Sequence, residues 1–321
     1  MTFVADCAIV VAVGLNTHHT QLAYSRTRAM LPALGKPLAA RALDRLYSAG
    51  IRRYVVVIGE EEGGVAAYLN SHLLSDMSVE FVVQTNADSM NAVLEEISTR
   101  YQPPFLTTSY NSFAHPHFAE RLLKRGSEFG DALVLGGADL PLPGSEHGYV
   151  GRTDGDKLVD IASRQTDTNR QGALLTDMAL CGRNFLDFVS KSAPKRTLME
   201  LFQDYVAAKQ RAYVVRAGWV LHIFTDEDLH VLNKHLLEEE EDVSILSEIP
   251  TNVQIIPPVR IDPQVSVGPE AVIGPYVYLE SGSNIGHHAV LRHSLVLQRA
   301  TVPPHTVISD AIVSSRARIE V

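Results

Sequence analysis

Short apolar runs alternate with helical patterns through the first part of the chain. Five runs have the length and composition of buried strands. They are Ala8 to Val13, Tyr54 to Ile58, Val79 to Val83, Phe105 to Thr108, and Ala132 to Leu135. Such alternation predicts an α/β domain with a mostly parallel sheet that helices cover on both faces. In sheets of this kind, ligands bind beyond the carboxyl ends of the strands.

Three helices are predicted between these runs. The first spans Leu38 to Ala49 and stops at Gly50, a residue suited to a helix C-terminal cap. The second follows Asp88. The third covers Phe118 to Lys124 and ends near Gly126.

Beyond Ser247 the pattern changes to a repeat of six residues. The column of large apolar residues is Ile261, Val267, Ile273, Leu279, Ile285, Leu291 and Leu297. A second column, mostly small or apolar, is Val265, Ala271, Val277, Ser283, Ala289 and Leu295. Stacked coils bury a column that no single coil could bury, so this spacing predicts a triangular parallel β-helix. The tail through Ile312 and Ile319 is expected to form one more, irregular coil that caps the end.

An acidic run, Glu238 to Asp242, separates the two patterns and is typical of a solvated helix end or linker. We therefore predict an α/β domain over residues 1–240, a linker over residues 241–250, and the β-helix over residues 251–321.

Composition narrows the classes of partner. With 45% hydrophobic and 20% charged residues, the chain is that of an ordinary globular protein. A net charge of -9 argues against a nucleic-acid or anionic-membrane surface. The longest apolar run, Cys7 to Leu15, is shorter than the roughly 20 residues that cross a bilayer, so we expect a cytoplasmic protein. The two cysteines, Cys7 and Cys181, lack metal-ligand spacing and are expected to be core thiols.

The stretch from Val10 to Ile51 resembles the opening of the sugar-1-phosphate nucleotidylyltransferases. The later part of this stretch, MLPALGKPL, is close to that family's PKxLLPVxGKPL motif. Weaker likenesses follow in PFLTTSYNSF, in YVGRTDGDKLVDIASRQ and in GWVLHIFTDEDL. The resemblance implies a Rossmann-like nucleotidyltransferase domain with a mixed, mostly parallel sheet, followed by a left-handed parallel β-helix.

The family makes NDP-sugars from a nucleoside triphosphate and a sugar phosphate, and expels pyrophosphate. Main-chain N–H groups of a glycine loop hold the phosphates, basic side chains balance the charge, and two aspartates hold Mg²⁺. By resemblance, the nucleotide-binding positions fall on Gly14, Asn16, Thr17, His18 and Gln84. Mg²⁺ is the expected cofactor if the protein is active.

Several of these positions carry residues that the family does not use. His18 replaces an arginine, and a neutral imidazole cannot do the work of a guanidinium on a triphosphate. The two basic catalytic positions fall on Arg28 and Arg164, which keep the charge. The two metal-binding aspartates fall on Asn111 and His222, and an amide with an imidazole suits Mg²⁺ poorly.

The GKP segment is open to two interpretations. Gly35, Lys36 and Pro37 either build only the turn before a helix, or Lys36 also contacts the phosphate of a sugar phosphate. We favour the phosphate contact, because the turn is expected next to the cleft.

Together these features favour a binding or regulatory subunit. Its cleft would hold a nucleotide, sugar phosphate or NDP-sugar without efficient turnover. The β-helix would assemble it with copies of itself or with an active paralogue.

Two alternatives stay open. An active enzyme with a displaced metal site could use Asp139, which ends the strand pattern in ALVLGGADLPL. An acyltransferase could instead use a histidine base on the β-helix. The candidates are His287, His288, His293 and His305.

Overall fold

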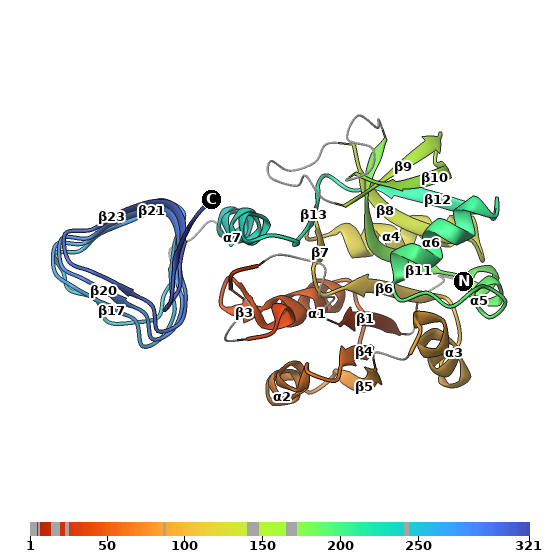
Figure 1. The fold of residues 1–321 in the computed structure, drawn as a ribbon, viewed down its shortest axis with the longest axis horizontal. Coiled ribbons are helices and arrows are strands. Elements are labelled where there is room, and N and C mark those ends of the chain that lie inside the picture. Colours follow the sequence, from red (N-terminus) through yellow and green to blue (C-terminus); the bar gives the residue numbers. More distant parts are fainter. Residues whose placement is uncertain are drawn as a thin grey trace. The chain divides into compact units, whose positions relative to one another are not determined.

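A computed structural model describes residues 5, 7–13, 20–22, 26–85, 88–139, 148–164, 172–240 and 244–321. The chain forms two compact units (Figure 1). The first comprises Met1–Thr17, Thr27–Met30 and Leu38–His222, and the second comprises His18–Arg26, Leu31–Pro37 and Ile223–Val321. The second unit thus combines two N-terminal segments with the C-terminal region. The predicted boundaries at residues 240 and 250 stay predictions.

The first unit is built on a nine-stranded mixed sheet of order β5-β4-β1-β6-β11-β8-β12-β10-β9. Its strands are β1 (Ala8–Ala12), β4 (Arg53–Gly59), β5 (Ser78–Gln84), β6 (Phe105–Ser109), β8 (Leu133–Ala138), β9 (Tyr149–Asp154), β10 (Lys157–Ser163), β11 (Ala173–Cys181) and β12 (Ala212–Arg216). The five predicted strands are β1, β4, β5, β6 and β8, so they are confirmed.

The direction of the strands differs in part from the prediction. Strands β5, β4, β1 and β6 run parallel, as do β8 and β12. Strands β9, β10 and β11 pair antiparallel with their neighbours. The mixed sheet is therefore confirmed, but a mostly parallel sheet describes its N-terminal half alone. The apolar pattern predicts no strand in this part of the sequence, but the likeness of YVGRTDGDKLVDIASRQ to the family's hairpin agrees with the antiparallel pair β9 and β10.

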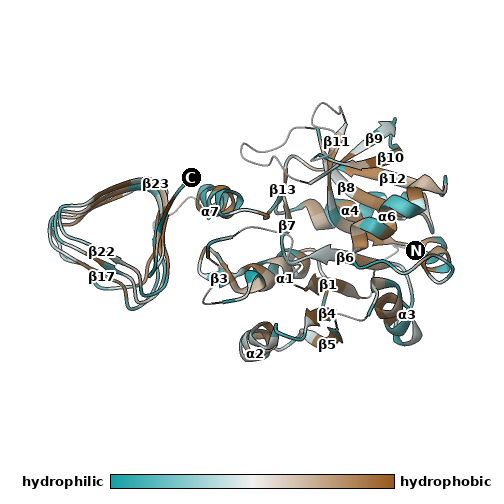
Figure 2. Cartoon of the chain, viewed as in Figure 1, coloured by the Kyte–Doolittle hydropathy of each residue, from teal (hydrophilic) through white to brown (hydrophobic). Residues whose placement is uncertain are grey.

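Helices cover both faces of this sheet. They are α1 (Leu38–Ser48), α2 (Gly63–His72), α3 (Met90–Arg100), α4 (Phe118–Gly126), α5 (Arg183–Val189) and α6 (Leu198–Ala207), with 3-10 turns η1 (Arg28–Met30) and η2 (Ser127–Phe129). Ile9 and Val11 of β1 share a buried cluster with α3, α5 and α6. Helices α1 and α4 pack on the sheet outside that cluster. Figure 2 shows the hydrophobic colour of the central strands β1 and β4.

The three predicted helices are α1, α3 and α4, whose existence is confirmed. Gly50 lies two residues after the end of α1 and has φ 94°, and its N–H donates to Tyr47 O over 3.0 Å, as expected of a C-terminal cap. Both cysteines are buried. No helix in the described part of the chain is long and apolar enough to span a membrane.

The second unit contains α7 (Asp226–Glu240) and the C-terminal coils, which we define as residues 244–321. The strands of these coils are β14 (Ser244–Ile245), β15 (Gln254–Ile255), β16 (Val259–Ile261), β17 (Ser266–Val267), β18 (Val272–Ile273), β19 (Val277–Leu279), β20 (Asn284–Ile285), β21 (Val290–Val296), β22 (Thr301–Val302), β23 (Val307–Val313) and β24 (Arg318–Glu320). They are drawn in blue in Figure 1, where they wind into a triangular stack.

Parallel pairing joins each coil to the next. Val259 pairs with Val277, and Val272 pairs with Val290, so three six-residue steps make one turn of the stack. The predicted large apolar residues from Ile261 to Leu291 are all buried. They form one continuous core inside the coils.

One end of this column differs from the prediction. Ile273 pairs with Leu291, and Leu279 pairs with Val296, so the step from one paired residue to the next is six residues in the first coil and five in the second. Val296 therefore continues the column in place of the predicted Leu297. The end of the chain also departs from a further coil, because β24 turns back and pairs antiparallel with β23.

Glycines allow the coils to stack closely at one corner. A Cβ added to Gly286 would overlap the backbone of Pro303 and Pro304, and a Cβ added to Gly268 would overlap the backbone of His287. The spacing between coils at this corner thus depends on the absence of a side chain at both positions.

We predict that Gly286→Ala lowers the free energy of unfolding by about 1–3 kcal/mol, the usual cost of overpacking. Denaturant unfolding would measure it. Gly63→Ala is the matched control, because a Cβ there meets nothing within 4 Å and the residue begins a helix. Equal unfolding midpoints for the two variants would contradict the close packing.

Candidate functional site

A short antiparallel ribbon brings two predicted positions onto neighbouring strands. Its strands are β7 (Ser112–Ala114) and β13 (Val220–His222), and His222 pairs with Ser112. Asn111 directly precedes β7. The two positions where the family resemblance places metal-binding aspartates therefore lie side by side in the chain's first unit.

A buried carboxylate lies against this ribbon. Strands β6 and β11 pair so that Thr107 lies opposite Ala179, which places Asp177 across from Ser109. Asp177 Oδ1 lies 2.8 Å from His222 Nε2, and Asp177 Oδ2 accepts a hydrogen bond from Ser109 Oγ. The side chains of His222 and Asp177 are only 4% and 14% exposed. Both carboxylate oxygens are thus engaged inside the protein.

A second contact holds the ribbon to β11. The hydroxyls of Ser112 and Thr176 lie 2.5 Å apart, and Thr176 Oγ1 also accepts from the N–H of Met178. The register of β11 against β8 shifts between Leu175 and Ala179. The irregular segment that carries Asp177 is therefore fixed by side-chain hydrogen bonds.

The hydrogen bonds keep Asp177 ionised. Burial raises the pKa of this carboxyl, but the hydrogen bond and charge of His222 and the hydrogen bond from Ser109 outweigh it and lower the pKa below its usual value. Nearby, burial raises the pKa of Tyr110, while the positive charge of Arg28 acts in the opposite direction. The charge of the predicted catalytic Arg28 therefore acts on Tyr110. The N–H of Tyr110 donates to Val11 O near the end of β1.

The other predicted basic residue also borders this site. The backbone N–H of Arg164 donates to Gly148 O over 2.9 Å. Gly148 has φ 119°, and a Cβ placed on it would lie 3.6 Å from His222 Nδ1. Arg164 is therefore attached by its backbone to a residue that packs over His222. We define Asp177, His222, Ser109, Asn111 and Arg164 as the β11 site.

The nucleotide-binding predictions are placed only in part. Gly14, Asn16, Thr17 and His18 lie outside the described residues. Gln84 ends β5 and is 5% exposed, and its Nε2 donates to Asp88 O over 3.4 Å. Its Oε1 has no hydrogen-bond partner within the described ranges, so a buried amide oxygen is left to accept a hydrogen bond.

The alternative metal ligand lies apart from the β11 site. Asp139 is 71% exposed and pairs with Arg216, with 2.8 Å between Oδ1 and Nη1. The register of β8 places residue 139 opposite Ala173. Ala173 is four residues from Asp177, or roughly 13 Å along a strand. The role of Asp139 as a metal ligand stays a prediction.

The GKP segment belongs to the second unit. Pro32–Ala33 (β2) and Lys36–Pro37 (β3) form a hairpin whose central residues, Leu34 and Gly35, both have positive φ. Asn233 of α7 accepts from Leu34 N over 2.8 Å and donates to Pro32 O over 2.9 Å. Gly35 and Pro37 thus build a turn that a buried asparagine holds, whereas Lys36 is exposed. The phosphate contact predicted for Lys36 stays a prediction.

The histidine candidates of the acyltransferase alternative divide into two places. His287, His288 and His305 lie together at one corner of the coils. His293 lies at another corner, where its ring stacks on Tyr276 with centroids 5.2 Å apart.

The β11 site does not fit the Mg²⁺ that the family uses. Magnesium needs hard oxygen ligands in near-octahedral geometry. The one carboxylate at the site, Asp177, already accepts from His222 and Ser109. An imidazole occupies the second predicted position, so we derive no chemical step through a metal here.

A separate groove lies along helix α4 and strand β12 of the first unit. It has a volume of about 560 Å³ and is lined mainly by α4 and β12, with Arg121, Lys124, Arg125 and Arg216 among its residues. Arg125 pairs with Glu128 and Asp156. The groove shares no lining residue with the β11 site.

Sequence reasoning missed the residue at the centre of the site. Asp177 is the one charged residue in the strand ALLTDMALC, whose other eight residues are all buried. A lone carboxylate in a buried strand signals a specific partner. The partner itself, His222, could not be read from the sequence, because the two residues meet only through the sheet and the ribbon.

Comparisons with known proteins agree with this fold. Residues 255–321 match the model of the GMPPB C-terminal domain, a domain of NDP-sugar pyrophosphorylases. A solved structure of the inositol-1-phosphate CTP transferase from T. maritima aligns with a TM-score of 0.59 and 16% sequence identity, covering 71% of this chain and 93% of that chain. No curated protein matches the chain significantly in sequence.

The first unit therefore has a mixed α/β fold like that of a nucleotidyltransferase. Within the C-terminal coils, residues 255–321 are similar to the GMPPB C-terminal domain. The resemblance of the chain to the sugar-1-phosphate nucleotidyltransferase family is thereby confirmed.

We predict that Asp177→Asn lowers the free energy of unfolding by about 2 kcal/mol at pH 7, because hydrogen bonds to a charged group contribute about 1.5–3 kcal/mol. The folded state lowers the pKa of Asp177, so its stabilisation is present above the unfolded-state pKa of about 3.9 and is lost as the pH falls through the lower, folded-state pKa. The difference in free energy of unfolding between Asp177→Asn and wild type should become smaller below about pH 4. Urea unfolding at a series of pH values would measure this difference.

Asp187→Asn is the control for this change, since Asp187 is an exposed residue of α5. A pH-independent difference for Asp177→Asn, or an equal effect of both variants, would show that Asp177 is not an ionised, buried partner.

We also predict that Asn233→Ala destabilises the protein by about 3 kcal/mol, because it leaves the buried Leu34 N–H without its acceptor. Thermal unfolding compared with Asn70→Ala, a change at an exposed helical position, would measure it. Equal stability of the two variants would rule out the role of Asn233 as the anchor of the hairpin.

Proposed function

We propose that this protein binds a nucleotide, a sugar phosphate or an NDP-sugar in its nucleotidyltransferase-like unit and turns it over poorly or not at all. In this proposal it acts as a binding or regulatory subunit of nucleotide-sugar metabolism. The resemblance to sugar-1-phosphate nucleotidyltransferases supports the class of ligand.

One observation carries the loss of catalysis. At the position where the family resemblance calls for a metal-binding carboxylate, His222 is buried and bonded to Asp177 over 2.8 Å. Extracting Asp177 to bind a cation would break two hydrogen bonds and leave an imidazole beside the metal. The cost of unpairing a buried charged group is several kcal/mol, so this pair favours a closed site over a metal-binding one.

Charge at the edge of the site supports ligand binding. Arg28 and Arg164 retain the two positive charges that would face phosphate groups, and guanidinium groups bind phosphates through paired hydrogen bonds. Gln84 adds a buried amide oxygen at the end of β5. In this proposal Gln84 contacts the base.

The proposal also covers oligomerisation, cellular location and the binding of Mg²⁺. The coils wind as a left-handed hexapeptide β-helix and join subunits into homo-oligomers or into complexes with an active paralogue. The protein works in the cytoplasm. Mg²⁺ is bound only together with a nucleotide, if it is bound at all.

The displaced metal site is the rival reading, with Asp139 as ligand. Its ion pair with Arg216 and its offset from Asp177 along β11 argue against it. The similar solved structure is that of an inositol-1-phosphate CTP transferase, so an inositol phosphate in place of a sugar phosphate is a second substrate class to test.

The test is a pyrophosphate-release assay with Mg²⁺, each common nucleoside triphosphate, and a panel of sugar-1-phosphates and inositol-1-phosphate. An intact family enzyme serves as the standard. We expect turnover at least roughly 10²-fold below that standard, the scale on which enzymes depend on preorganised charge. Calorimetric titration with the same compounds should detect binding.

Variants separate the two outcomes. Arg28→Gln should weaken binding of the phosphate ligand by about tenfold, equivalent to one lost charge-assisted hydrogen bond. Arg183→Gln, an exposed arginine at the start of α5, is the control. If the wild-type protein turned over near the rate of the standard, and Asp139→Asn abolished that turnover, the protein would be an active enzyme with a displaced metal site. Absence of binding to every compound would refute the binding subunit.

A further inference from the structure

One corner of the C-terminal coils carries polar residues at the same position in three successive coils. Glu270, His288 and His305 follow one another there, with φ values of 58°, 57° and 59°. The pairings that flank them confirm the correspondence, since Val272 lies beside Val290 and Val290 beside Val307. The left-handed backbone at each position turns the chain and directs the three side chains outward.

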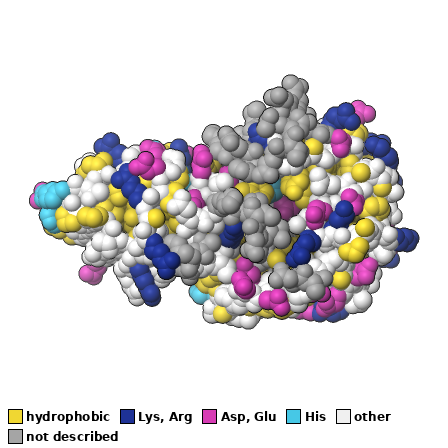
Figure 3. All heavy atoms as spheres, in the orientation of Figure 1, with side chains coloured by type: hydrophobic (Ala, Val, Ile, Leu, Met, Phe, Trp, Pro, Cys, Tyr) yellow, Lys and Arg dark blue, Asp and Glu magenta, His cyan; other side chains and the backbone are white. Residues whose placement is uncertain are grey.

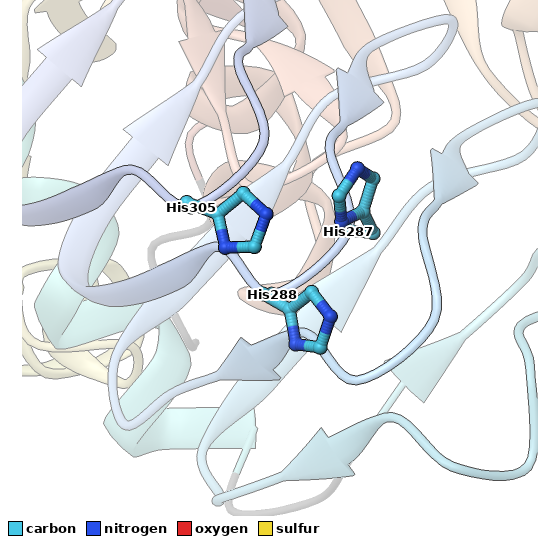
Figure 4. Close-up of side chains that lie close together, drawn as sticks. All are labelled: His287, His288 and His305. Atoms are coloured by element: carbon cyan, nitrogen blue, oxygen red, sulfur yellow. The ribbon is translucent and has the colours of Figure 1, made fainter.

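His287 completes a cluster at this corner, which we call the histidine corner: His287, His288 and His305 (Figure 4). All three side chains are exposed, and one ligand nitrogen from each lies within 4.8 Å of the others. The rings of His288 and His305 stack with centroids 4.8 Å apart, and the ring of His287 lies across both. Figure 3 shows histidine side chains gathered on the surface of the coils.

The backbone holds these histidines in place before any ligand arrives. His288 N donates to Pro269 O over 3.1 Å, and His305 N donates to His287 O over 3.0 Å. Gly268 and Gly286 fix the spacing of the coils beneath the corner, because a side chain at either position would overlap the next coil. A ligand that bridges the rings thus meets a preorganised frame and orders only exposed side chains.

We propose that the histidine corner binds a divalent transition-metal ion, with Zn²⁺ as the best fit. Zinc binds imidazole nitrogens at about 2.0–2.1 Å in tetrahedral geometry, which places ligand atoms about 3.4 Å apart. Bringing nitrogens together from within 4.8 Å needs only small rotations of exposed rings. Imidazole ligands select zinc, copper or nickel over magnesium and calcium.

A carboxylate supports the cluster from the neighbouring coil. Glu270 Oε2 lies 3.4 Å from His288 Nδ1. When His288 binds the metal through Nε2, its Nδ1–H donates to this carboxylate, the usual outer partner of a zinc-bound histidine. Three protein ligands leave the fourth position of a tetrahedral ion for water or for a donor from another molecule.

The metal would join successive coils. His287 and His288 belong to one coil and His305 to the next, so one ion would link both near the end of the stack. Binding to the folded state alone stabilises it. The assignment rests on the coils and is independent of the proposed function of the first unit.

The test is a Zn²⁺ titration of the full chain, followed by calorimetry or by competition with a chromophoric chelator. We expect one Zn²⁺ ion per chain at micromolar concentration or below, and a rise in melting temperature that a chelator reverses. The variants His288→Asn and His305→Asn remove ligands but keep a residue that tolerates positive φ. Each should weaken binding more than about tenfold, and Glu270→Gln by about tenfold.

His293→Asn is the matched control, because His293 also has positive φ in these coils but lies at another corner. It should bind Zn²⁺ as wild type does. Binding that His293→Asn reduces as much as His288→Asn would overturn the assignment, as would a wild-type chain without micromolar binding. In those cases the three rings form only a stacked ladder. Circular dichroism confirms that each variant is folded.

Discussion

A single antiparallel strand joins the two halves of the first unit's sheet. Strand β11 pairs with β6, the end of the parallel half, and with β8, the start of the other half. Two contacts of the β11 site follow from this placement. It sets Asp177 opposite Ser109 and brings the ribbon with His222 against the same carboxylate. The carboxylate at position 177 therefore joins Ser109 and His222 through hydrogen bonds.

The sequence predicted the parallel strands and the interior of the coils well, for physical reasons. Strands such as β1 and β4 are buried on both faces and read as continuous apolar runs. The coils repeat one pattern, so each step supports the next. Strands β9 and β10 lie at the sheet edge with mixed burial, so the apolar pattern did not show them and only the likeness to the family's hairpin indicated them.

The candidate site was predictable only where a local motif existed. Asn111 and His222 were located by resemblance, and the ribbon does place their strands together. No sequence motif surrounds Asp177, and its hydrogen-bond partners Ser109 and His222 lie 68 and 45 residues away in the sequence. The one-residue shortening before Val296 also escaped the sequence, because Leu295, Val296 and Leu297 are all apolar. Periodicity alone cannot choose among adjacent apolar residues.

The hairpin at residues 32–37 has a consequence for synthesis of the chain. Its buried partner Asn233 lies 199 residues after Leu34. At translation rates of about 5–20 residues per second, the hairpin leaves the ribosome roughly 10–40 s before that partner does. The second unit therefore cannot fold in order from the N-terminus, because the hairpin lacks its buried partner until the C-terminal region has been synthesised.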